Sequence, residues 1–198
     1  MNCINFSGTI KSFGERGGQF KTLWIAVELT SKEGTQSTVF INFPIDSTPN
    51  SKKAQKADYI KSRLVKGETI FISDATVKLV SLSKPDGNGG WLKEEKVGLG
   101  GNISNIRLGV NIPNTNVALV EGNITKHNQE SNKIVVEESY RLPNTNEWKT
   151  RPIPVLIDSS VAYMFEGNNL VGKDAFVIGT LVGTESSVYI QATRVITK

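Results

Sequence analysis

The sequence predicts an all-β protein built from two copies of one small module. The first observation behind this prediction is a restart past the middle of the chain, where residues 116–126 repeat the N-terminal alternation when Gly122 is placed on Gly8. The second is a further match in the same order, because residues 67–72 resemble residues 172–177. The third is that each match is an apolar alternation interrupted by glycine. Internal repetition of this kind indicates a tandem arrangement.

The chain length supports this division. Its 198 residues suffice for one large domain or two small ones, and the repeat favours two. Residues 111–116 are polar, contain a proline and carry no periodic signal. We therefore expect a first domain at residues 1–112 and a second at residues 113–198.

Alternation of apolar and polar residues predicts five strands in the first copy. The expected strands are residues 4–13, 21–29, 35–43, 69–82 and 97–108. A short helix is expected at residues 52–64, with Ser51 as its N-cap. Residues 84–90 are rich in turn formers and predict a hairpin tip.

The second copy repeats the same order of elements. Its expected strands are residues 117–126, 133–142, 149–157, 173–182 and 188–197. A short helix is expected at residues 161–169, between the third and fourth of these strands. Three strands, a helix and a final hairpin describe the OB-fold, a five-stranded Greek-key barrel. The predicted fold class is therefore all-β, with two tandem OB-fold barrels.

Composition excludes several classes of protein. The apolar runs are shorter than the roughly 18 residues of a membrane span, and the N-terminus lacks a basic-then-apolar signal. The single cysteine, Cys3, precludes an intrachain disulfide and fits a reducing compartment. We expect a cytoplasmic protein without a membrane partner. The net charge of +4 permits nucleic-acid binding only if positive charge gathers on one face.

Catalysis is not supported by the residue inventory. His127 is the only histidine, and it has no cysteine or histidine cluster with which to bind a metal or act as a general base. Residues 167–173 match most of a phosphate-binding P-loop, but Asp174 occupies the position of the required hydroxyl and a strand is expected to follow. We predict no enzyme activity, no cofactor, no metal and no small-molecule substrate.

The aromatic residues carry the clearest functional signal. Trp24 lies on the polar face of its expected strand, and Phe40 shares a face with Thr38 and Asn42. Large aromatic side chains on solvent faces indicate an interaction surface. The alternative is that they line the interface between the two barrels or the rim of a core. The candidate aromatics are Trp24, Phe40, Trp91, Trp148 and Tyr140.

Basic residues interleave with these aromatics. The candidate cations are Lys11, Arg16, Lys21, Lys84, Lys93, Lys149 and Arg151. Aromatic faces for bases and cations for the backbone are what single-stranded nucleic acid requires. A further basic run at residues 52–63 is a secondary candidate, because such a run on an exposed helix is usually a solvated face.

Two stretches of the second copy resemble bacterial single-stranded-DNA-binding proteins. These are residues 117–124, with an apolar-x-Gly strand, and residues 172–179, with Gly-x-x-apolar-x-apolar-x-Gly. Trp148 enters the third strand between them, whereas the first copy lacks a tryptophan there. The resemblance implies a non-enzymatic protein that coats single-stranded DNA in replication, repair and recombination. It also implies a homodimer, because the family usually assembles four OB-folds.

The chain departs from that family at its end. The family usually carries an acidic C-terminal tail, whereas here the last expected strand runs to Lys198. We therefore expect a plasmid, phage or specialised variant without tail-mediated recruitment. Two alternatives remain open: an RNA-binding OB protein, and a tandem-OB scaffold that uses the aromatics to bind another protein.

Overall fold

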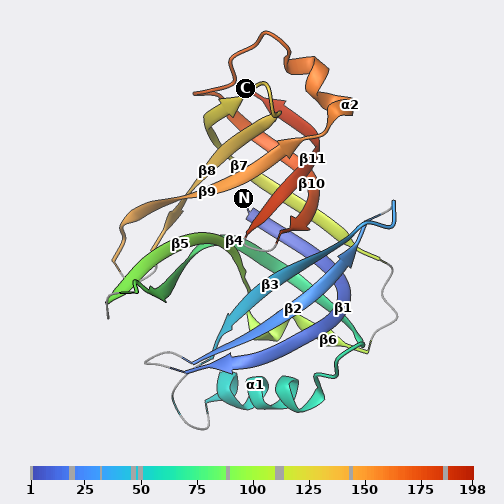
Figure 1. Cartoon of the computed structure of the whole chain (residues 1–198), viewed down its shortest axis with the longest axis vertical. Coiled ribbons are helices and arrows are strands. Elements are labelled where there is room, and N and C mark those ends of the chain that lie inside the picture. Colours follow the sequence, from blue (N-terminus) through green and yellow to red (C-terminus); the bar gives the residue numbers. More distant parts are fainter. Residues whose placement is uncertain are drawn as a thin grey trace.

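The structure is a computed structural model of the whole chain (Figure 1). It describes all residues except 1, 18–20, 32, 46–47, 49–50, 88–89, 110–113, 143–144 and 185–186. The side chains of residues 81–85, 91, 93 and 94 are likewise not described. The expected domain boundary at residues 112 and 113 therefore lies outside the described residues. The described part is mostly β-strand, as the alternation predicts.

Five strands of the N-terminal half close into a ring, which we call the first ring. Their bounds are β1 Asn2–Arg16, β2 Thr22–Thr30, β3 Gln36–Pro44, β4 Thr69–Pro85 and β5 Trp91–Gly100. Antiparallel pairs join β1 to β2, β2 to β3, β5 to β4 and β4 to β1, and a short parallel pair joins β3 to β5. The helix α1 (Lys52–Arg63) lies between β3 and β4, and Ser51 accepts a hydrogen bond from the Ala54 amide at its start.

Five strands of the C-terminal half form a second ring with the same connections. Their bounds are β7 Asn116–Asn128, β8 Lys133–Arg141, β9 Trp148–Ile157, β10 Asp174–Gly183 and β11 Val188–Thr197. Here too the first strand pairs with the second and fourth, and the third pairs in parallel with the fifth. A short helix, α2 (Ser159–Ala162), and the 3-10 turn η2 (Tyr163–Phe165) lie between β9 and β10.

The two rings match at the positions that the repeat predicts. A side chain on Gly8 would overlap the Glu28 carbonyl oxygen, and one on Gly122 would overlap that of Glu137. Each glycine therefore permits the close approach of a neighbouring strand. The strand pairing then shifts by one residue just after each glycine, as expected at a β-bulge.

Asn2 and Asn116, which the repeat places at equivalent positions, make equivalent hydrogen bonds in the two rings. The buried Asn2 amide exchanges two hydrogen bonds with the backbone of Val77 on β4, both at 3.2 Å. Asn116 exchanges two with the backbone of Leu181 on β10, both at 2.8 Å. Each side chain thus replaces a missing backbone partner near the start of its ring.

The rings share one continuous sheet, because the start of β1 pairs antiparallel with the start of β7. Figure 1 shows one ring above the other, with α1 under the first ring and α2 at the far end of the second. Inward-facing aliphatic residues fill both rings; on β2 these are Leu23, Ile25, Val27 and Leu29. The hairpins β4–β5 and β8–β9 extend toward the same side of the molecule.

Two expected elements are wrong. The strand expected at residues 97–108 ends at Gly100, and the chain continues through the 3-10 turn η1 (Ile103–Asn105) into a short strand, β6 (Ile106–Leu108). The Phe43 ring packs against Gly101 closely enough to exclude a side chain there. The pairing of β5 with β3 ends at the preceding residue, Gly100. The helix expected at residues 161–169 is only a four-residue helix followed by η2.

Candidate nucleic-acid interface

Strands β2 and β3 present two aromatic side chains on the outer face of the first ring. Trp24 is half-buried and Phe40 is 46% exposed, and their ring centroids lie 6.3 Å apart at an interplanar angle of 45°. Strand parity places both outside the ring, because their neighbours Ile25 and Ile41 point into the core. The pair forms a tilted aromatic surface with one exposed member.

Gly14 supports the Trp24 indole. It lies opposite Trp24 in the β1–β2 pair, and a Cβ atom at this position would lie 2.9 Å from the indole ring. The indole therefore lies directly over the β1 backbone. This contact fixes the tilt of the ring and leaves the remaining surface toward Phe40 and the solvent.

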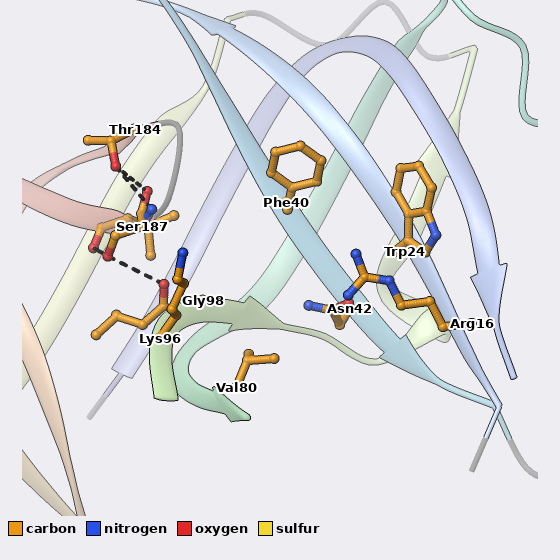
Figure 2. A pocket seen from close by; sticks show the side chains of 11 residues that line it. Arg16, Trp24, Phe40, Asn42, Val80, Lys96, Gly98, Thr184 and Ser187 are labelled. Atoms are coloured by element: carbon orange, nitrogen blue, oxygen red, sulfur yellow. Dashed lines mark hydrogen bonds between the residues drawn. The ribbon is translucent and has the colours of Figure 1, made fainter. Parts of the chain in front are cut away.

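The aromatic pair lines a groove of about 260 Å³ to which both rings contribute. We call it the Trp24 groove. Its lining residues are Arg16, Trp24, Phe40 and Asn42 from β1–β3, Val80 and Lys96–Gly98 from the β4–β5 hairpin, and Thr184, Ser187 and Val188 from the second ring. Figure 2 shows Arg16 and Asn42 beside Trp24, with Lys96 and Ser187 on the other side of Phe40. The groove thus has aromatic walls and a cation toward each end.

The turn between β10 and β11 is held against the first ring by hydrogen bonds. Thr184 and Ser187 bond each other through backbone and side chain, at 2.8 to 3.0 Å. The Ser187 hydroxyl then donates to the Val97 carbonyl at 3.5 Å, and the Gly183 amide donates to the Ser37 hydroxyl at 3.4 Å. These contacts position the second-ring wall of the Trp24 groove.

Arg16 is the exposed cation of this groove. Within the part of the chain that the structure describes, no carboxylate pairs with it. Its guanidinium is therefore available to a phosphate oxygen beside the aromatic pair. The structure thus brings together three residues that the sequence predicts as site residues: Arg16, Trp24 and Phe40.

Arg151 and Tyr140 occupy a different environment from the exposed one expected for them. The Arg151 side chain is 16% exposed and pairs with the buried Glu138 at 2.7 Å. Its guanidinium also lies 4.4 Å from the Tyr140 ring centroid and donates to the Val77 carbonyl of the first ring at 3.2 Å. These contacts hold the Arg151 guanidinium at the junction of the rings.

Lys78 lies at the same junction. Burial and the positive charge of Arg151 lower the pKa of its ammonium group. Neither residue is thus an independent surface cation. Strand alternation could not reveal this, because the contact joins β4 of one ring to β9 of the other.

Other predicted residues lie away from the Trp24 groove. Trp148 is 70% exposed at the start of β9, and Lys149 follows it as the strand partner of Tyr140. Lys11 pairs with Glu28 at 2.6 Å, and Lys21 is exposed just before β2. The β8–β9 pair therefore carries a second, separate set of an aromatic and a cation.

The hairpin β4–β5 carries three more predicted residues. Trp91 pairs with Pro85, Lys93 with Ser83 and Lys84 with Leu92 along the backbone. Their side chains lie outside the described part of the structure.

The structure adds groove residues that the sequence did not single out as a site. Asn42 could have been found, because it shares the outer face of β3 with Phe40. Lys96, Thr184 and Ser187 could not, since they reach the groove only through the packing of two hairpins from different rings. Parity within one strand carries no information about such contacts.

The described residues include the single histidine and the P-loop-like segment. His127 lies on β7, and partial burial lowers the pKa of its imidazole. No group of three or more potential metal ligands is found among them. The P-loop-like residues 167–173 are followed by strand β10 and not by the helix that such a loop requires. None of the helices in the described ranges has the length and apolar character of a membrane span.

Comparison with known proteins finds solved structures of similar fold. No protein-family model and no curated protein matches the sequence. Among solved structures, the chain is similar to the wild-type single-stranded DNA binding protein from Thermus aquaticus, with a TM-score of 0.65 and 15% identity, over 100% of this chain and 93% of that one. A deletion mutant of the same protein matches with a TM-score of 0.63 and 16% identity, over 100% and 94% of the two chains. At this identity the likeness concerns the fold alone.

Proposed function

We propose that the chain consists of two OB-fold barrels, residues 1–112 and 113–198, that bind single-stranded DNA and catalyse no reaction. The order of three strands, a helix and two strands supports the barrel assignment, as does the parallel closure of each ring. The likeness in fold to a single-stranded DNA binding protein supports the choice of ligand.

One observation carries this proposal. Trp24 and the exposed Phe40 form an aromatic surface inside a groove that also holds Arg16 and Lys96. Bases stack on such aromatic faces while cations follow the phosphates. Because every base has a π-face, the binding is expected to show little sequence preference. Trp148 and Lys149 on the β8–β9 pair would extend the surface to further nucleotides.

A fluorescence titration tests the proposal. Tryptophan emission of the intact protein should be quenched by oligo(dT), more weakly by oligo(U), and least by duplex DNA of equal length. The logarithm of the affinity should fall with the logarithm of the salt concentration, by about 0.7 per neutralised phosphate. Stronger quenching by oligo(U) would favour the RNA-binding alternative. Absence of quenching by any strand would favour the protein scaffold and contradict the proposal.

We also propose that two chains associate into a homodimer that presents four barrels. The two-ring chain supplies half of that number. Light scattering should then give a mass twice that of one chain.

A further inference from the structure

A second groove lies between α1 and β6, under the first ring. We call it the α1–β6 groove; it measures about 430 Å³ and shares no lining residue with the Trp24 groove. Its lining residues are Lys56, Tyr59, Ile60, Arg63, Glu68 and Ile106–Gly109. Three cations and one carboxylate thus line a single groove, although Arg107 lies 44 or more residues from the two cations of α1 in sequence.

An exposed tyrosine organises two of these cations. Tyr59 is 51% exposed, with the Lys56 ammonium 5.3 Å and the Arg63 guanidinium 5.4 Å from its ring centroid. Arg63 also donates a hydrogen bond to the Tyr59 hydroxyl. Such cation–π contacts hold two long side chains beside the groove. The basic run of α1 is therefore not a uniformly solvated face.

The three cations have no carboxylate partner among the described residues. The ion pairs found there join Lys11 to Glu28, Lys61 to Glu15, and Arg151 to Glu138. Lys56, Arg63 and Arg107 therefore leave the groove with uncompensated positive charge. A ligand with repeated negative charge is the complementary partner.

The end of β1 links the Trp24 groove to the helix that lines the α1–β6 groove. Arg16 lines the Trp24 groove, and its neighbour Glu15 pairs with Lys61 of α1 at 2.9 Å. The C-terminal end of β1 therefore contacts the Trp24 groove through Arg16 and α1 through Glu15.

We infer that the α1–β6 groove binds backbone phosphates of the strand that occupies the Trp24 groove, through Lys56, Arg63 and Arg107. This inference rests on the proposed function. It assigns phosphate contacts to this groove and base stacking to the Trp24 groove. Strands too short to span both grooves should then make no use of it.

Charge removal in the intact protein tests the inference. The variant R63Q/R107Q removes two groove cations, and the matched control K52Q/K53Q removes two from the first turn of the same helix, outside the groove. With oligo(dT) of about 40 nucleotides, the salt slope of R63Q/R107Q should be shallower by about 1.4 than that of the control. With about eight nucleotides, roughly the site of one barrel, both variants should bind equally.

The outcomes separate this inference from the proposed function. Equal salt slopes for the two variants with the long strand would overturn the inference, while quenching by oligo(dT) would still support single-strand binding. No quenching of the wild-type protein by any strand would overturn both.

A spectroscopic measurement on the unmodified protein guards against misfolding of the variants. The NMR signals of the Arg63 side chain and of the Arg107 and Gly109 amides should shift on addition of the long oligo(dT). Inorganic tripolyphosphate at the same ionic strength should shift them less. Equal or larger shifts with tripolyphosphate would indicate a site for free phosphates and would overturn the assignment to a nucleic-acid strand.

Discussion

At the scale of the residue, Trp24 meets two requirements of a stacking surface. Its indole is held in place, because it packs over the Gly14 backbone and beside Phe40. It is also only half-buried, so part of the ring remains available to a ligand. Phe40 is more exposed and contributes less to the folded structure. Removal of the Trp24 side chain should therefore cost more stability than removal of the Phe40 side chain.

Phe40→Ala should weaken oligo(dT) binding with little loss of stability. Stacking of one base is worth roughly 1–3 kcal/mol, which corresponds to about a 5- to 150-fold change in Kd. Because Phe40 is 46% exposed, the free energy of unfolding should fall by under about 1 kcal/mol. Fluorescence titration and urea denaturation of the same sample measure the two effects.

A matched control is available on the second ring. Tyr163 in η2 is 66% exposed and is not among the residues that line the Trp24 groove. Tyr163→Ala should therefore leave the Kd for oligo(dT) unchanged. If Phe40→Ala and Tyr163→Ala bind equally well, Phe40 does not stack on bases.

At the scale of the element, local alternation in the sequence predicts where the strands lie but not which strands pair. Nine of the ten expected strands are found with ends shifted by a few residues, and Ser51 caps α1 as predicted. The exception at residues 97–108 arises because one apolar run serves two partners: β5 pairs with β4 and β3, whereas β6 returns to β4. Periodicity reports which face is buried and not which strand is the neighbour.

The residues of the candidate site also divide into those that strand alternation predicts and those that depend on contacts between the rings. Trp24 and Phe40 were found from strand parity, because each alternates out of phase with buried aliphatic residues. Arg151 could not be assigned in this way, since its partner Val77 lies 74 positions away in sequence. The Thr184–Ser187 wall of the groove likewise depends on how the two rings pack. Local patterns thus predict side-chain exposure within a ring but not contacts between rings.

At the scale of the whole molecule, the two rings are joined by strand pairing and by one buried charge network. The start of β1 pairs with β7, and Arg151 connects Glu138 and Tyr140 of the second ring to Val77 of the first. Val77 of this junction lies on β4, and the β4–β5 hairpin lines the Trp24 groove. The relative placement of the rings should therefore govern the shape of that groove.

Arg151→Met should destabilise the protein by about 3–5 kcal/mol, because it breaks the ion pair between Arg151 and the buried Glu138. Replacing both residues, as in Arg151→Met with Glu138→Leu, should recover much of this loss. Chemical denaturation of the wild type, the two single variants and the double variant measures the coupling. Additive losses, with the double variant losing as much as the two single variants together, would show that Arg151 and Glu138 are not coupled.

The central claim is that single-stranded DNA lies in the groove between the rings, against Trp24 and Phe40. Ultraviolet cross-linking of the intact protein to oligo(dT), followed by mass spectrometry of the cross-linked peptides, tests it most directly. Cross-links should concentrate on the β2 and β3 peptides that carry Trp24 and Phe40, with weaker ones on the peptide of Trp148. An excess of unlabelled oligo(dT) should abolish them. Cross-links confined to other surfaces, such as η2 around Tyr163, would contradict the claim.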